Sequence, residues 1–187
     1  GWRGAGFDLK GLAGPRPALE AAPDGVELHR SPGEAPGNHD AVLLGFKPQQ
    51  LGALAPGLQG LAGEGVAVHY LLAGLTLTQL KSAFPDAVSY LRVMPNLAAR
   101  INKSPVILAH KGLDEAGCGS ASALYGALGT AVWLKSEENF DLLTALAGSG
   151  PGFVCRFVDA LEHAALTPGA DPEHPHRLAP PPAEGAA

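Results

Sequence analysis

Cysteine, methionine, aromatic and basic residues are all scarce in this chain, and each scarcity narrows what the protein can be. The two cysteines, Cys118 and Cys155, form no Cys-x-x-Cys pair and no disulfide framework, as is typical of proteins from the reducing cytosol. Lys and Arg total 13 against 18 Asp and Glu, which gives a net charge of −5. A nucleic-acid-binding protein needs a basic face to neutralise phosphates, so this class is disfavoured.

Apolar segments are interrupted by Gly, His or Lys well before the ~18 residues that a membrane-spanning helix requires, so no membrane partner is expected. The N-terminal sequence GWRGAGFDLK contains no apolar signal-peptide core, which favours a cytoplasmic protein. Met94 is the single methionine, so the chain lacks a start of its own and we expect it to be part of a longer protein.

The chain does contain enough apolar residues for a core, since they make up 46% of its 187 residues. Short apolar runs, which we predict to be strands, alternate with stretches of helical pattern. Runs that are apolar on both faces and separated by crossovers indicate a parallel sheet covered by helices, an α/β fold. The predicted strands are 7–12, 26–29, 41–46, 66–72, 88–93 and 106–110, and the predicted helices or crossovers are 17–22, 49–61 and 75–84.

The pattern changes after Gly119. Residues 120–129 predict a helix, 131–135 a last strand, 138–147 another helix, and 149 to about 166 a long helix. We therefore expect a boundary near Gly148, with an α/β domain at 1–147 and the start of a helical domain at 148–187. Three consecutive prolines at 180–182 are incompatible with a regular helix, so we expect an extended end there.

Glycines and one arginine near the N-terminus invite a nucleotide-binding interpretation. The glycines of GWRGAGF precede a predicted strand, whereas a phosphate-binding loop follows a strand and opens a helix, so we interpret them as a helix C-cap. Arg16 follows the predicted strand 7–12, where nucleotide-binding folds carry an acid that binds the adenosine ribose. An arginine there favours NADP through a contact with the 2′-phosphate; an ordinary solvated arginine in a turn explains it equally well.

Two further segments could bind a ligand, and two histidines near the C-terminus raise the question of a metal site. Lys47 follows a predicted strand at the carboxyl edge of the sheet, where such folds bind ligands, although a lysine there is commonly just solvated. The sequence GSGP at 148–151 opens a predicted helix whose free amides could hold a carboxylate, or it forms a tight turn. His174 and His176 lie in the proline-broken end of the chain, where three ligands cannot converge, so no metal is expected.

Four strings in series resemble the pyrroline-5-carboxylate reductase family, NAD(P)H-dependent enzymes of the last step of proline synthesis. They are DAVLLGFKPQ (40–49), LLAGLTLTQL (71–80), RVMPNLAARI (92–101) and ENFDLLTALAGSGPGFVCRFVDAL (138–161). The resemblance implies a Rossmann-like parallel sheet with helices on both faces, followed by the start of an all-helical dimerisation domain. It also implies reduction of 1-pyrroline-5-carboxylate to L-proline with NADPH or NADH, in a homodimer or higher homo-oligomer.

The resemblance assigns site residues position by position, and it assigns no catalytic residue and no metal ligand. Ser149 and Gly150 match the segment that lies near the substrate. The expected cofactor-binding residues are Arg16, whose match is loose, and Gly45, Phe46, Lys47, Pro48, Ala73, Gly74, Met94 and Asn96.

The chain also departs from the family pattern. The family's first strand with its glycine-rich loop is expected before Gly1, and its substrate loop and most dimerising helices after Ala187. Ala98 stands where the family usually has Pro, and Gly152 where it usually has Ala. The alternative is therefore a remnant of this family without activity. A β-hydroxyacid dehydrogenase is disfavoured because it uses a lysine base in its helical domain, and residues 149–187 contain no lysine.

Overall fold

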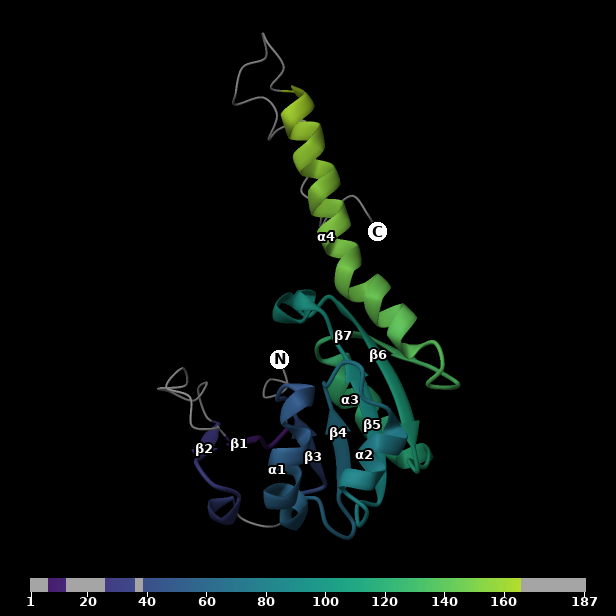
Figure 1. Cartoon of the computed structure of the whole chain (residues 1–187). Coiled ribbons are helices and arrows are strands. Elements are labelled where there is room, and N and C mark those ends of the chain that lie inside the picture. The colour runs from purple at the N-terminus through teal and green to yellow at the C-terminus, as the bar shows by residue number, and fades with distance from the viewer. Residues whose placement is uncertain (1–6, 13–25, 36–38, 166–187) are drawn as a thin grey trace. The chain divides into compact units, whose positions relative to one another are not determined.

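The computed structural model describes residues 7–12, 26–35 and 39–165, and divides the chain into two units, 1–141 and 142–187 (Figure 1). The domain ranges expected from the sequence, 1–147 and 148–187, stay a prediction. None of the described helices is long and apolar enough to cross a membrane.

The first unit contains a five-stranded sheet in the order β3-β4-β5-β6-β7 (Figure 1). Strands β3, β4 and β5 run parallel, and β7 runs parallel to β6. The expected α/β class with a largely parallel sheet is therefore confirmed. The strand bounds are β3 (Ala41–Leu44), β4 (Ala67–Tyr70), β5 (Ser89–Met94), β6 (Ser104–Lys111) and β7 (Gly129–Trp133).

One pairing departs from the fully parallel sheet that was expected: β6 runs antiparallel to β5, with Val93 opposite Leu108. The connection between them, residues 95–103, contains the 3-10 helix η5 (Leu97–Ile101). A parallel return needs a crossover of about a dozen or more residues, so this shorter connection allows only an antiparallel return.

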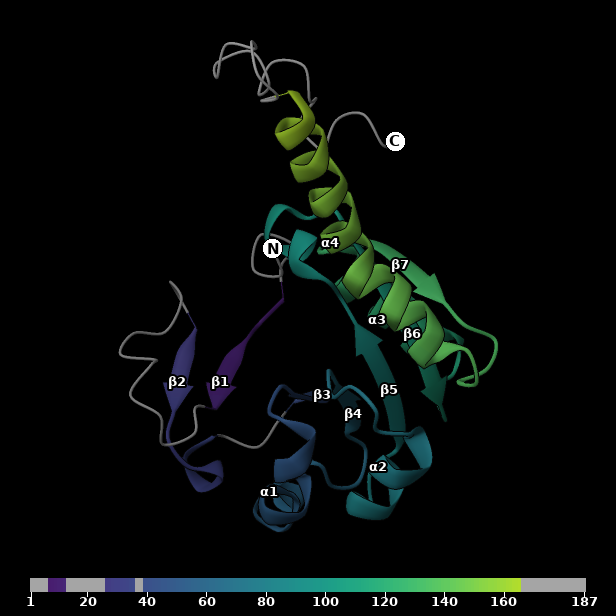
Figure 2. The same cartoon turned by 45° about the horizontal axis from the view of Figure 1, so that its top comes forward.

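A second, two-stranded sheet is formed by β1 (Lys10–Leu12) and β2 (Glu27–His29), which are parallel with Gly11 opposite Leu28 (Figure 2). Both strands have three residues and lie within predicted ones, and β1 begins at Lys10 rather than at Phe7. The predicted helix 17–22 and the N-terminal glycines lie outside the described residues.

The described residues of the first unit include the helices α1 (Leu51–Leu58), α2 (Leu77–Ala83) and α3 (Glu115–Gly126). The first two lie within predicted helices, and 3-10 turns cover Pro32–Glu34, Pro48–Gln50 and Gln59–Leu61. The predicted start of α3 at residue 120 is wrong. Asp114 caps this helix by accepting a hydrogen bond from Gly117 N at 2.7 Å, so the helix starts early and runs through Gly117 and Gly119.

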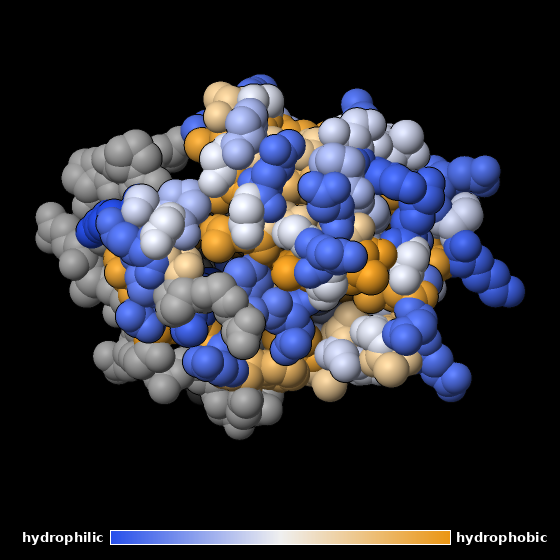
Figure 3. Space-filling view, turned by 90° about the horizontal axis from the view of Figure 1, so that it is seen from below, coloured by the Kyte–Doolittle hydropathy of each residue, from blue (hydrophilic) through white to orange (hydrophobic). Residues whose placement is uncertain are grey.

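Successive side chains of β5 point to opposite faces of the sheet, and those on each face contact a different helix. The Tyr90 hydroxyl donates to Phe84 O at 2.6 Å, at the end of α2. Leu91 and Val93 point to the opposite face, where they form a buried cluster with Tyr125 of α3. Seen from below, hydrophilic residues cover much of the surface, and hydrophobic ones form separate patches (Figure 3).

Helix α4 (Phe140–Ala165) supplies the described part of the second unit. The sequence predicts two helices, 138–147 and 149–166, with GSGP opening the second. This prediction is wrong, because Gly148, Ser149, Gly150 and Pro151 all lie inside α4. Proline lacks an N–H and crowds the preceding turn, which commonly ends a helix, yet here the helix continues through it.

A buried polar pair connects β4 to α3 on the sheet face that carries Leu91. His69 Nδ1 and the Tyr125 hydroxyl are hydrogen-bonded at 2.8 Å. His69 is 6% exposed, and burial lowers its pKa to about 4. Burial also raises the pKa of Tyr125. Both groups are therefore neutral at physiological pH.

We predict that the free energy of unfolding falls as the pH is lowered from about 6.5 to about 4. In this window the unfolded chain protonates His69 at its ordinary pKa of about 6.5 while the folded protein keeps it neutral. The loss attributable to His69 is about 3 kcal/mol, measured by urea unfolding at a series of pH values. His69→Gln should remove this component, and parallel pH profiles for the two proteins would contradict the assignment.

Candidate cofactor edge

The three parallel strands end at the same edge of the sheet, and three of the expected cofactor segments follow those ends. The register places Leu44, Tyr70 and Arg92 in one row across β3, β4 and β5. In an open parallel sheet, the crevice outside the carboxyl ends of the strands is where ligands bind. We call the segments 45–48, 73–74 and 94–96 the cofactor edge.

The first segment follows β3. Gly45 is exposed, and no described atom lies within 4 Å of a Cβ built there. Phe46 and Pro48 are half-buried, and Lys47 is exposed. Lys47 N donates to Gln50 Oε1 at 3.2 Å, and Pro48 begins a 3-10 turn, so the chain turns sharply just beyond the strand.

The second segment follows β4. Gly74 has φ of +72°, a conformation that side chains rarely adopt, and a Cβ there would meet no described atom within 4 Å. Ala73 and Gly74 are exposed between the buried Leu72 and Leu75. The Tyr70 hydroxyl donates to Leu75 O at 2.9 Å and closes the turn, and burial raises the pKa of Tyr70, which keeps this donor protonated.

The third segment begins with Met94, the last residue of β5. Met94 and Asn96 are half-buried. Asn96 caps η5 because its Oδ1 accepts from Ala98 N at 2.9 Å, and Asn96 N donates to Ser104 Oγ at 2.9 Å. Ser104 is fully buried and its hydroxyl donates to Pro105 O at 2.9 Å, so the backbone at Asn96 is held from inside the protein.

Gly129 explains how Ser104 can lie so close to the neighbouring strand. It has φ of +145°, and a Cβ there would come within 2.1 Å of Ser104 O. Only glycine fits this approach between β6 and β7. The packing that holds Asn96 therefore depends on a residue far from the edge in sequence.

The remaining expected site residues fall elsewhere. Ser149 and Gly150 lie in α4 in the second unit, with Ser149 exposed, and their role stays a prediction. Arg16, His174 and His176 lie outside the described residues. Among the residues that are described, no three His, Cys, Asp or Glu side chains form a group that could hold a metal ion.

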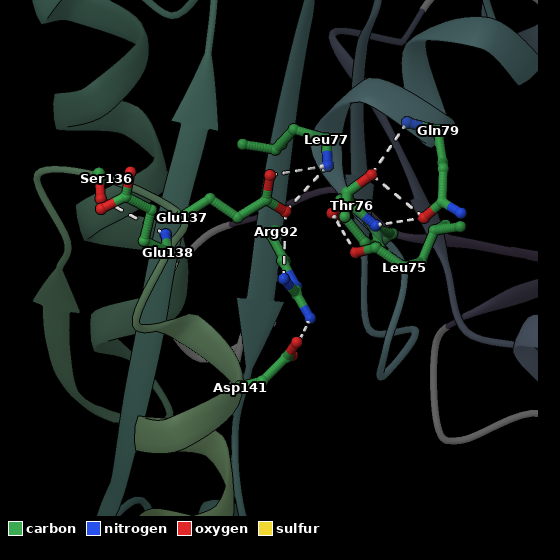
Figure 4. Close-up of polar contacts among 10 residues, drawn as sticks. Leu75, Thr76, Leu77, Gln79, Arg92, Ser136, Glu137, Glu138 and Asp141 are labelled. Atoms are coloured by element: carbon green, nitrogen blue, oxygen red, sulfur yellow. Dashed lines mark hydrogen bonds and ion pairs between the residues drawn. The ribbon is translucent and has the colours of Figure 1, made fainter.

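Sequence reasoning missed a polar cluster beside this edge. Arg92 lies in the middle of β5 and is 2% exposed, and it forms ion pairs with Glu137 and Asp141 (Figure 4). The signal was present in the string SYLRVM, where a cation interrupts a strand that is otherwise buried. A buried charge requires partners, so such an arginine marks a structured polar contact.

Comparisons with known proteins bear on the family and the fold of the chain. Residues 137–187 match the family model described as pyrroline-5-carboxylate reductase dimerisation. Pyrroline-5-carboxylate reductase 2 of Bacillus subtilis is 33% identical over 135 residues, covering 72% of this chain and 48% of that protein. The solved pyrroline-5-carboxylate reductase of Coxiella burnetii superposes with a TM-score of 0.75 at 26% identity, covering 83% of this chain and 58% of that one. The chain belongs to the pyrroline-5-carboxylate reductase family.

The fold of this family member is Rossmann-like, as the resemblance implied. The Plasmodium falciparum pyrroline carboxylate reductase, solved with NADP bound, has a TM-score of 0.72 at 18% identity, covering 95% of this chain and 67% of that one. At that identity the likeness concerns the fold. The chain spans about half the length of the curated family members that it matches.

We predict that Ser104→Ala lowers the free energy of unfolding by about 1–3 kcal/mol, because it removes the buried acceptor of the Asn96 N–H. Urea unfolding measures the change. Ser82→Ala is the matched control, since its hydroxyl donates to Thr78 O on the exposed face of α2, and a change within about 0.5 kcal/mol is expected. Equal losses in the two variants would contradict the role given to Ser104.

Proposed function

We propose that this protein binds NADPH or NADH and acts in the reduction of 1-pyrroline-5-carboxylate to L-proline. The observation that carries the proposal is the cofactor edge, where three parallel strands of a family member end together. In this reaction the cofactor delivers a hydride to the carbon of the cyclic C=N bond, and the nitrogen takes the proton. The protein contributes alignment of the two reactants, which can account for a large part of the rate.

The edge fits a dinucleotide on steric grounds. Gly45 and Gly74 are exposed and leave open space where side chains would stand, so a ligand can approach the backbone closely. We infer that Gly45, Phe46, Lys47 and Pro48, with Ala73 and Gly74, lie along the cofactor. Met94 and Asn96 are the residues we expect near its nicotinamide, with the Asn96 backbone held by Ser104.

The substrate contact is assigned to Ser149 and Gly150. Their amides lie inside α4 rather than at a helix start, so the first turn of a helix does not provide the carboxylate site. The exposed Ser149 hydroxyl remains as a donor for the substrate carboxylate.

We propose a second copy of the chain as the protein partner. The described part of α4 exposes Leu142, Leu146, Phe153, Phe157 and Leu161, which recur at intervals of four or seven residues and form one apolar stripe. The match of residues 137–187 to a dimerisation model supports burial of this stripe in a homo-oligomer. Burying such a stripe stabilises association through the hydrophobic effect.

The proposal is tested by NADPH oxidation with purified protein, with and without 1-pyrroline-5-carboxylate. Imine-dependent turnover of about 1 s⁻¹ or faster, a rate usual for enzymes of this class, would support the proposed activity. NADPH binding in calorimetry without turnover would favour the alternative, a family member without activity. Neither binding nor turnover would contradict the proposed function.

Cofactor preference gives a separate prediction at Arg16. Arg16→Ala should raise the KM for NADPH by roughly 10- to 150-fold, the equivalent of about 1.5–3 kcal/mol for one charge-assisted contact with the 2′-phosphate. The KM for NADH should stay nearly unchanged, because NADH lacks that phosphate. Lys81→Ala, which removes a positive charge from the exposed face of α2, is the control and should change neither KM. Equal effects of Arg16→Ala on both cofactors would contradict the assignment.

A further inference from the structure

Arg92 is a buried cation on the face of β5 that also carries Tyr90. Its side chain is 2% exposed, and its guanidinium carbon lies 4.0 Å from the centroid of the Phe140 ring. A cation over an aromatic face is attracted by the ring, but an isolated buried charge remains costly. Its carboxylate partners therefore decide what this residue does.

Glu137 is the partner that links Arg92 to another element. Arg92 Nη1 lies 3.1 Å from Glu137 Oε1, and Glu137 is 24% exposed. The two oxygens of the same carboxylate accept the Leu77 amide at 2.9 and 3.1 Å (Figure 4). Arg92 Nη2 pairs with Asp141, which is mostly exposed. One carboxylate thus bridges the guanidinium of β5 to the first residue of α2.

The Leu77 amide lies at the end of the turn that carries Ala73 and Gly74. Tyr70 holds this turn from the strand side through Leu75 O. Thr76 caps α2 by accepting from Gln79 N at 3.2 Å. Glu137 supplies the remaining contact from outside the segment, so it reaches the turn from a part of the chain sixty residues away.

We propose that Arg92 is a positioning residue that orients Glu137 so that its carboxylate holds the Leu77 amide and fixes the turn Ala73–Gly74 at the cofactor edge. Arg92 lies two residues before Met94 on β5, so one side chain connects two of the three segments of that edge. A guanidinium can bond both Glu137 and Asp141 in a fixed geometry, which an apolar residue of similar volume cannot do. The inference rests on the proposed function, which assigns this turn to the cofactor.

The test is amide hydrogen exchange by NMR on the full 187-residue protein, with NADPH affinity measured by calorimetry on the same samples. Arg92→Met removes the charge, and Glu137→Gln weakens the acceptor at a residue that is partly exposed and so leaves a folded protein. In both variants the Leu77 amide should exchange at least about tenfold faster, the effect of losing a hydrogen bond to a charged group. The amides of Leu91 and Val106 in the core serve as internal references for global stability.

Glu138→Gln is the matched control, because it makes the same change at the exposed neighbour of Glu137, and exchange at Leu77 should stay within about twofold. In the double variant that combines Arg92→Met with Glu137→Gln, the Leu77 amide should exchange no faster than in Glu137→Gln alone, because Arg92 acts through the Glu137 carboxylate. The Kd for NADPH should rise at least about fivefold in both single variants and stay unchanged in the control.

Several results would overturn the inference. Exchange at Leu77 that stays unchanged in Glu137→Gln would mean that the carboxylate does not hold the turn. Faster exchange at Leu77, Leu91 and Val106 together would show a general structural role. Faster exchange at Leu77 alone with an unchanged NADPH Kd would show that the turn does not serve the cofactor. If the unsubstituted protein binds no NADPH, the proposed function fails, and the exchange data alone decide whether Arg92 positions the turn.

Discussion

Parallel pairing of β3, β4 and β5 is the constraint on which the candidate site depends. Parallel strands joined by crossovers must all end at the same edge, so whatever follows them is gathered there. The row formed by Leu44, Tyr70 and Arg92 means that β3 and β4 end level with each other and that β5 continues two residues further, to Met94. A Cβ at Gly45 or at Gly74 would meet no described atom within 4 Å, and the exposed backbone at both positions then contributes to one surface rather than to two separate loops.

Polar contacts from residues outside the three segments support the cofactor edge. Ser104 of β6 holds the Asn96 backbone, and its own position depends on the close approach of Gly129. Glu137 holds the Leu77 amide and is itself held by Arg92. Each support combines a buried group with a backbone amide, an arrangement in which a lost partner leaves a costly unsatisfied group.

Local patterns predicted most elements but failed where capping or connection length decided the outcome. The strands from β3 to β5 were expected within two residues at each end because their apolar runs are short and clearly bounded. The start of α3 was missed because Asp114 caps a helix that continues through two glycines. The break predicted at Gly148–Pro151 does not occur in α4, where the helix on either side continues through one proline.

The sequence by itself determined the family, the α/β class and the order of the segments along the cofactor edge, because these follow from apolar periodicity and from motif strings read in series. Tertiary structure alone decided that β6 returns antiparallel, that Gly129 must lie against Ser104, and that His69 is buried against Tyr125. It also decided that Arg92 reaches Glu137, some forty-five residues away. Such contacts depend on packing between elements distant in the chain, which neither residue spacing nor local propensity encodes.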